Sequence, residues 1–319
     1  MEKQTNIHSN LTILRSGDPN TILGQMTPRE VLARYGFPNN LLSHSAKSQK
    51  CNKVGVLARV LFLTPGAFCP AATRGCLQAC LGHTSGRMQM PTHAACRDKR
   101  AALYLGNPKV FLQMLSVDLS RLVADARTAN LRSAARLNGT SDLAWEERHP
   151  ELFEDFPAVA FFDYTKVITR MKNSLRRDGW PDNYHLTFSA APGNHTAARQ
   201  ILDTGGNVAV VFWPKVPATF WGFSVVDCDS HDARFLDPQG VVVGLTAKGL
   251  ARVDRSGFTV RPCPHCGPEA PELELVSATE DRYATTVHQC SGCGFQLRQR
   301  MTAPAMRLKV AETNLQQAA

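Results

Sequence analysis

Short apolar runs, each about as long as one β-strand, recur along most of the chain and constrain its fold more than any other feature. The first, VGVLARVLFL from Val54, is almost continuously apolar, which is typical of a strand buried on both faces. Helical or polar segments separate several of the runs, and this alternation implies right-handed crossovers and parallel strand pairing. The later runs are SAARLNG (133–139), AVAFFDY (158–164), YHLTFSA (184–190), NVAVVFW (207–213), GFSVVD (222–227) and GVVVGLT (240–246).

About seven strands in this pattern predict an α/β protein, with a complete or partial β/α barrel favoured over a sandwich. A doubly wound open sheet is the alternative, because periodicity does not fix strand order. Helices are predicted over 95–106 and from Pro108, where apolar residues recur at helical spacing. A shorter helix is predicted in TPREVLARYG, with Thr27 as N-cap, Glu30 at N3 and Gly36 after its end.

Ten cysteines are spread unevenly over 319 residues, and their density is too low for a disulfide scaffold. No apolar run is long enough to span a membrane, and the opening MEKQTNIHSN lacks the apolar core of a signal peptide. We therefore expect a cytoplasmic protein without membrane association, whose reduced cysteines serve metal sites before disulfides. Four cysteines fall within residues 69–96 and four within residues 263–293.

The C-terminal group consists of two C-x₂-C pairs, CPHC (263–266) and CSGC (290–293), with strand-like segments between them. Two such turns on a returning hairpin bring four thiolates to one tetrahedral ion, which is the pattern of a zinc ribbon. A four-sulfur shell favours Zn²⁺ and leaves no open position, so the site is predicted to be structural. His265 and His288 are interpreted as bystanders. The predicted ligands are Cys263, Cys266, Cys290 and Cys293.

The other group follows the first strand, in the loop LTPGAFCPAATRGCLQACLGHTSGRM, with the spacing C-x₆-C-x₃-C. This spacing is unusual for zinc. Three thiolates in one loop above a β/α unit favour an iron–sulfur cluster, with [4Fe-4S] as one option and one iron free of protein thiolate. Zinc stays open as the alternative metal, and Cys96, His83 or a small molecule stay open as the fourth ligand. The three predicted loop ligands are Cys69, Cys76 and Cys80.

The arrangement of this loop is similar to that of the radical S-adenosylmethionine enzymes, although their usual spacing is C-x₃-C-x₂-C. In those enzymes the open iron binds the methionine part of the cofactor, and a barrel holds the substrate. The similarity therefore makes S-adenosylmethionine a candidate cofactor beside the cluster.

Several consecutive motifs together resemble the gene product 88 family, which is named from a mycobacteriophage protein and found in phages, prophages and bacterial mobile DNA. The similarity runs from about Leu61 to about Thr246. The resemblance implies that Cys69, Cys76 and Cys80 belong to a loop shared by the family, whereas Cys96 does not. It implies no established activity. The zinc-ribbon pairs lie outside the similarity. The motifs are CPAATRGC, CLGHTSGR, RDKRAALYLGNPKVFLQML and RLNGTSDLAWE.

Polar side chains gather directly after the predicted strands, where β/α barrels carry their active sites. Asp142 and Glu146 are four residues apart, so a helix would place both carboxylates on one face for substrate binding or acid–base work. A helix cap with a solvated face is the alternative, and Lys166 fits a phosphate contact, an ion pair or a surface lysine. The candidate catalytic residues are Asp142, Glu146, Asp163 and Lys166, and the candidate cofactor-binding residues beside the loop cysteines are Asn138, Ser141 and Ser189.

These observations predict four regions: a lead-in (1–53), a β/α barrel-like domain (54–254), the zinc ribbon (255–302) and a tail (303–319). The favoured function is a phage- or mobile-element-type metalloprotein, specifically an iron–sulfur barrel enzyme of a radical S-adenosylmethionine-like arrangement. The alternatives are a nucleic-acid-binding protein of phage or plasmid replication or regulation, and a metal-stabilised scaffold without catalysis. No G-x-S-x-G or P-loop motif is present, which argues against a serine hydrolase or a P-loop ATPase.

The formal charge of +9 is distributed unevenly between the predicted regions. Residues 255–319 carry seven basic and six acidic residues, so +8 remains in residues 1–254. Nucleic acid, if bound, is therefore expected on the barrel body, because phosphate contacts need a basic surface. The nearly neutral ribbon is open to a protein partner, and the sequence leaves the substrate and the oligomeric state open.

Overall fold

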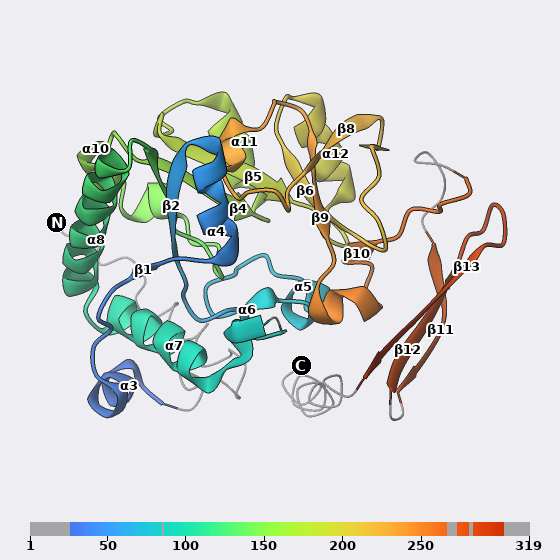
Figure 1. Cartoon of the computed structure of the whole chain (residues 1–319), viewed down its shortest axis with the longest axis horizontal. Coiled ribbons are helices and arrows are strands. Elements are labelled where there is room, and N and C mark those ends of the chain that lie inside the picture. Colours follow the sequence, from blue (N-terminus) through green and yellow to red (C-terminus); the bar gives the residue numbers. More distant parts are fainter. Residues whose placement is uncertain (1–25, 85, 267–272, 281–282, 303–319) are drawn as a thin grey trace.

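The computed structural model describes residues 26–84, 86–266, 273–280 and 283–302, and these residues form a large central sheet and a small second sheet (Figure 1). The hydrogen-bonded strand order of the central sheet is β1-β2-β3-β4-β5-β6-β9-β8-β7, and β10 pairs with the end of β6. The strands are β1 (Leu42–Ser43), β2 (Val56–Leu61), β3 (Arg132–Arg136), β4 (Ala160–Thr165), β5 (Tyr184–Ser189), β6 (Val208–Phe212), β7 (Thr219–Phe220), β8 (Phe223–Asp227), β9 (Val242–Thr246) and β10 (Thr259–Val260).

The seven predicted strands are confirmed as β2 to β6, β8 and β9, and every neighbouring pair among them is parallel. Only the short edge strands β1 and β7 pair antiparallel with their neighbours. Parallel pairing follows from the crossovers, since each strand re-enters the sheet after a segment that runs back along it.

The helices of these crossovers pack on one face of the sheet. Leu115 of α8 lies in the same buried cluster as Phe161 of β4, and Ile201 of α12 packs with Val210 of β6. The α-helices are α3 (Pro28–Tyr35), α4 (Ala46–Lys50), α5 (Arg74–Gln78), α6 (Leu81–Thr84), α7 (Pro91–Gly106), α8 (Pro108–Thr128), α9 (Trp145–Arg148), α10 (Glu151–Asp155), α11 (Ile168–Arg176) and α12 (His195–Asp203), and the 3₁₀ turns are η1 (Cys51–Val54), η2 (Gly86–Gln89), η3 (Arg234–Leu236) and η4 (Gly249–Val253).

Short segments, rather than long helices, cover the opposite face. Ala58 of β2 and Phe162 of β4 form a buried cluster there with Cys51 of η1 and Ala233 beside η3. The strand order follows the chain from β2 to β6, with crossover helices on one face. This arrangement differs from a doubly wound sheet, in which helices cover both faces. Among the described residues the order does not close on itself.

The predicted N-terminal helix is confirmed as α3. The Thr27 hydroxyl accepts a hydrogen bond from the Glu30 backbone N–H at 3.3 Å, and the Glu30 carboxylate accepts one from the Thr27 N–H at 2.7 Å. This reciprocal capping box satisfies two backbone donors at the helix start. Helix α7 begins at Pro91, four residues before its predicted start, because Pro suits the first helical position.

The second sheet is antiparallel and consists of β11 (Glu274–Glu280), β12 (Tyr283–Gln289) and β13 (Gln296–Thr302), drawn in red at the right of Figure 1. The two strands expected between the cysteine pairs are confirmed. β13 was not predicted, because its sequence, QLRQRMT, is mostly polar. In the described part of the chain, no helix is both long and apolar enough to cross a membrane.

Candidate metal centres and their surroundings

The three loop cysteines lie in the chain that follows β2, at the C-terminal edge of the parallel sheet. Cys69 lies in a turn closed by its own N–H, which donates to the Gly66 carbonyl at 3.1 Å. Cys76 lies on α5, whose N-cap Thr73 accepts the Cys76 N–H at 3.2 Å. Cys80 directly precedes α6. Short capped helices therefore hold a loop that its Pro and Gly content predicts to be irregular.

The three thiols are near enough to act on one another electrostatically. Burial, with smaller contributions from the Cys80 and Cys76 thiols, raises the pKa of the Cys69 thiol to about 12. Burial likewise raises the pKa of the Cys80 thiol to about 11, with a further contribution from Cys76. Yet the three sulfurs do not all lie within 4.8 Å of one another, as ligands of a single ion would. Their spacing is therefore wider than that of the C-terminal group.

Two cations stand beside this loop. Lys166, directly after β4, donates to the Ser189 hydroxyl at 2.8 Å, and its ammonium lies 5.7 Å from the ring centroid of Phe258. The buried Arg97 of α7 donates to the Met88 carbonyl at 3.1 Å. The charges of Lys166 and Arg97 both lower the pKa of the Cys80 thiol, opposing the effect of burial. A negatively charged group bound at the loop would be stabilised by the same charges.

Cys96 and His83 are the two residues considered as a fourth ligand of the loop site, and the structure describes the side chain of Cys96 only. Cys96 is an exposed residue of α7. The side chain of His83 lies outside the described residues. The structure therefore leaves the fourth ligand open.

Asp142 and Glu146 share one buried guanidinium. Helix α9 begins at Trp145, so Asp142 precedes the helix instead of sharing a helical face with Glu146. Arg170 of α11 donates to the Asp142 carboxylate at 2.6 Å and, through two nitrogens, to Glu146 at 2.6 and 2.8 Å. The Arg170 side chain is 3 % exposed. Such a bidentate pair fixes the orientation of both carboxylates.

Asn138 organises the turn of the RLNGTSDLAWE motif. Its side-chain oxygen accepts from the Ser141 hydroxyl and the Leu143 N–H, both at 2.9 Å. Its backbone N–H donates to Asp163 at 2.7 Å, and Tyr184 donates to the same carboxylate at 2.9 Å. These residues form one buried network, which holds the turn after β3 against β4 and β5.

Burial raises the pKa of Asp163 from 3.8 to about 7. The folded protein therefore binds the proton of Asp163 more tightly than the unfolded chain, so this group's contribution to stability is complete below pH 4 and is lost as the pH rises to about 7. We expect the free energy of unfolding of the wild type, relative to Asp163→Asn, to fall across this window. Urea unfolding of both proteins at several pH values measures the difference, and a constant difference would contradict the raised pKa.

Sequence reasoning missed several residues of these networks. Arg170 carries no motif signal, because its partners lie 24 and 28 positions away along the chain. On the opposite face of the sheet, the buried Cys228 contacts the Tyr164 hydroxyl at 3.3 Å and the Lys47 ammonium at 3.5 Å. In the sequence, Cys228 is recognisable only as a cysteine that follows a strand, and this position does not predict its contacts with Tyr164 and Lys47.

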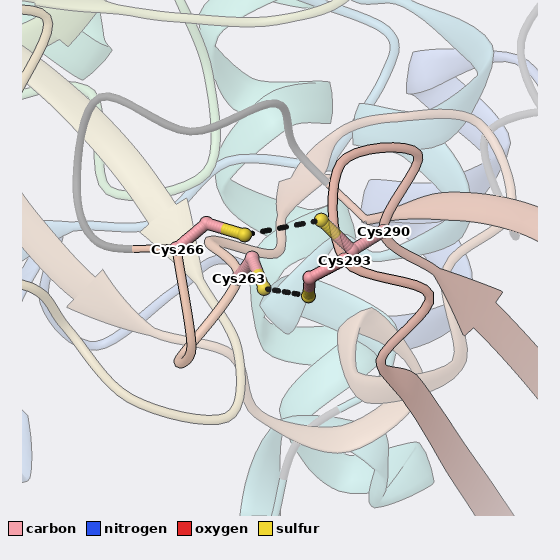
Figure 2. A group of neighbouring side chains, drawn as sticks. All are labelled: Cys263, Cys266, Cys290 and Cys293. Carbon is pink, nitrogen blue, oxygen red and sulfur yellow. Dashed lines mark hydrogen bonds between the residues drawn. The ribbon is translucent and has the colours of Figure 1, made fainter.

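The four C-terminal cysteines converge from two turns (Figure 2). The sulfurs of Cys263 and Cys293 are 3.6 Å apart, and those of Cys266 and Cys290 are 3.8 Å apart. All four lie within 4.8 Å of one another, a set that could hold a metal ion such as zinc. The Cys293 backbone N–H lowers the pKa of the Cys290 thiol to about 7, which favours the thiolate that a metal requires.

The two nearby histidines stand apart from the four sulfurs. The His265 ring packs on Phe295, with ring centroids 4.5 Å apart. His288 is buried on β12, where burial, together with the charge of Arg261, lowers its pKa to about 4. Neither belongs to the group of ligand atoms that could hold a metal.

Removing one sulfur is expected to abolish metal binding at this group. Cys266 is exposed, so Cys266→Ser removes a ligand without opening a core cavity. We expect the variant to lose one bound zinc ion per chain, measured by atomic emission after exhaustive dialysis. Cys96→Ser is the matched control, because it removes an exposed thiol that does not belong to the four-cysteine C-terminal group. Equal zinc in Cys266→Ser and wild type would exclude this site.

Fold and sites together define an α/β protein with a parallel-rich sheet, a three-cysteine loop at the C-terminal edge of that sheet and a separate group of four cysteines that could bind a metal. The family model described as Gene product 88 matches residues 38–263 of this chain. The chain belongs to the gene product 88 family, and the match ends at the first cysteine of the ribbon, leaving β11 to β13 outside it. No curated protein and no solved structure matches the chain.

Proposed function

We propose that this member of the gene product 88 family is a phage- or mobile-element-type iron–sulfur enzyme. Its three-cysteine loop would bind a [4Fe-4S] cluster above a partial β/α barrel, and its ribbon would hold structural zinc. The observation that carries the proposal is the spacing of Cys69, Cys76 and Cys80: mutually close, yet wider than ligands of one ion. A cluster carries its thiolates on separate irons, so it accommodates such a spacing.

The surroundings of the loop support this assignment. Burial raises the pKa values of Cys69 and Cys80, so a bound cluster would have to displace the protons of both thiols, and positive charge near the loop would offset that cost. Lys166 and Arg97 supply positive charge beside Cys80, where thiolate and cluster charge would gather. A cluster with one iron free of protein thiolate supplies one-electron chemistry and an open binding position.

Lys166 and Ser189 are proposed to bind the ligand that occupies this position. The Lys166 ammonium donates to Ser189 and has no carboxylate partner among the described residues, so it can pair with a ligand carboxylate. The methionine part of S-adenosylmethionine carries such a group. The buried carboxylates Asp142, Glu146 and Asp163 would then orient the surrounding loops, since their oxygens are held by Arg170, Asn138 and Tyr184.

Spectroscopy of protein purified without oxygen tests the proposal. Reduction by dithionite should bleach a broad visible absorption and produce an electron paramagnetic resonance signal, and S-adenosylmethionine should alter that signal. Lys166→Met should retain the signal and weaken the response to S-adenosylmethionine. A signal that S-adenosylmethionine leaves unchanged would reject this cofactor, and a colourless protein would reject the cluster.

One observation favours nucleic-acid binding as a second candidate. Residues 31–97 contain eight basic residues and no acidic residue, nearly the whole net charge of +9. This stretch includes the three-cysteine loop, and phosphate backbones bind to such basic surfaces. Some of the charges are already paired, as Arg59 is with Asp125. The eight are Arg34, Lys47, Lys50, Lys53, Arg59, Arg74, Arg87 and Arg97.

Charge reversal near the loop tests this candidate. If nucleic acid binds there, Arg74→Glu and Arg87→Glu should weaken retention of single- or double-stranded DNA at low salt, since both residues are exposed. Lys172→Glu, on the exposed side of α11, is the matched control. Equal binding by all three variants and the wild type would exclude this face.

A further inference from the structure

We propose that the four-cysteine ribbon supports the three-cysteine loop through a connecting segment, residues 249–261, so that metal bound at the ribbon stabilises the conformation of the loop. The two cysteine groups are far apart in sequence and belong to different sheets. The connecting segment comprises η4, the turn after it and β10, and leads directly into Cys263. In the proposed function this loop holds the cluster. The coupling proposed here concerns the conformation of the loop, whether or not a cluster is bound.

One side of the connecting segment packs against the loop. Ala251 forms a buried cluster with Ala247 and with Ala79, the residue before Cys80. A Cβ on Gly249 would lie 2.9 Å from the Thr84 carbonyl, and a Cβ on Gly75 would overlap Ser256. Both glycines therefore mark a close approach of the segment to α5 and α6. Figure 1 shows the segment, in orange, beside these two helices.

The other side of the connecting segment packs against the ribbon. His288 of β12 is 3 % exposed, and β12 lies against η4, where His288 interacts electrostatically with Asp254 and Arg261. Strand β13 lies against η4, and the Gln299 side chain is next to Arg252 and Trp213. Arg252 in turn stacks on Trp213, with the guanidinium carbon 4.8 Å from the ring centroid. The central strand β12 and the edge strand β13 of the ribbon thus both contact the segment.

The connecting segment is internally braced, so it can transmit a displacement. The Asp254 carboxylate accepts from the Thr259 N–H at 3.0 Å and from the Ser256 hydroxyl at 2.7 Å. The Thr259 hydroxyl donates to the Ala251 carbonyl at 2.8 Å. Arg261, two residues before Cys263, donates to the Arg252 carbonyl at 3.1 Å. A contiguous chain of packed and hydrogen-bonded groups therefore joins the two cysteine groups.

Metal at the ribbon would act on the loop because a zinc-type site supplies much of the folding free energy of a small ribbon. Without the metal, the contacts of His288 and Gln299 would lose their support, and the segment would hold Ala79 and Thr84 less firmly. Coupling of this kind is reciprocal, so loosening the loop contact should also weaken metal binding at the ribbon.

Hydrogen exchange of the full-length, iron-free protein tests the coupling. Cys266→Ser should make amides of residues 69–84 exchange about tenfold faster, within the usual range for coupled sites. Amides of α8, on the helical face of the sheet, should be unchanged. Because the protein is iron-free, the result does not depend on whether the loop binds a cluster. Unchanged exchange in residues 69–84 would overturn the proposal.

If Cys266→Ser accelerates amide exchange throughout the chain, a second variant is needed to separate the coupling from general destabilisation. Gly249→Ala places a methyl group against the Thr84 carbonyl at a residue with φ +54, and it leaves all four sulfurs in place. We expect zinc to be lost to a competing chelator severalfold more readily than from wild type. Gly179→Ala, another left-handed glycine but with open space around it, controls for backbone strain. Equal zinc retention in Gly249→Ala and Gly179→Ala would overturn the proposal.

Discussion

Replacing Cys80 by serine is expected to remove iron and visible absorption from protein purified without oxygen, while the fold is retained. Cys80 is one of three partly buried thiols at the C-terminal edge of the sheet, and serine is close to it in size. A cluster bound by three protein thiolates loses much of its anchorage when one is removed. The iron content should fall to less than about a tenth of the wild-type value, as expected when a ligand is lost. Iron analysis and the absorption spectrum measure this effect.

Two control variants and a folding measurement make this result specific. Cys96→Ser should retain its iron, because the proposed cluster is held by Cys69, Cys76 and Cys80, whereas Cys96 is exposed on α7. Loss of its iron would instead identify Cys96 as the fourth ligand. Cys266→Ser should retain the visible absorption of the cluster. Any decrease should be no larger than the coupling between the ribbon and the three-cysteine loop produces. Circular dichroism and the midpoint of thermal unfolding report whether Cys80→Ser folds. Wild-type iron in a folded Cys80→Ser protein would show that this thiol is not a ligand.

Replacing Arg170 by methionine is expected to destabilise the fold strongly. Arg170 is the shared partner of Asp142 and Glu146, and its side chain is 3 % exposed. Removing one partner of a buried ion pair costs about 3–5 kcal/mol, because the remaining charge is buried without compensation. Urea unfolding should show this loss in the free energy of unfolding. A loss below about 1 kcal/mol, typical of exposed pairs, would contradict the interpretation.

The matched control for this prediction is another arginine pair. Arg121 lies 3.8 Å from Asp118, and its side chain is 65 % exposed. Arg121→Met should therefore change stability by about 1 kcal/mol or less. Adding Asp142→Asn and Glu146→Gln to Arg170→Met should restore part of the lost stability, since the uncompensated charges are removed.

The elements with strong local signals could be predicted from the sequence. Strand β2 and the other parallel strands coincide with short, largely apolar runs, and α3 has both partners of its capping box within four residues. The four ribbon sulfurs follow from two C-x₂-C turns. Strand β13 was missed because its polar residues resemble a loop, and pairing with β12 decides its conformation.

The candidate site was less predictable because its contacts join distant segments. Asp142 and Glu146 were recognised as a pair, but the reason for their spacing is Arg170, on a different helix. The contacts between η4 and the loop depend on packing that no motif records. The sequence spacing alone could place the three loop cysteines close together. Only the structure shows that their sulfurs lie farther apart than the ligands of a single ion would.

The metal content of wild-type protein purified without oxygen tests the central claim most directly. Iron, acid-labile sulfide and zinc are measured per chain on the same sample. The account predicts about four iron, about four sulfide and one zinc, the composition of one [4Fe-4S] cluster and one ribbon site. Two zinc ions per chain with neither iron nor sulfide would contradict it.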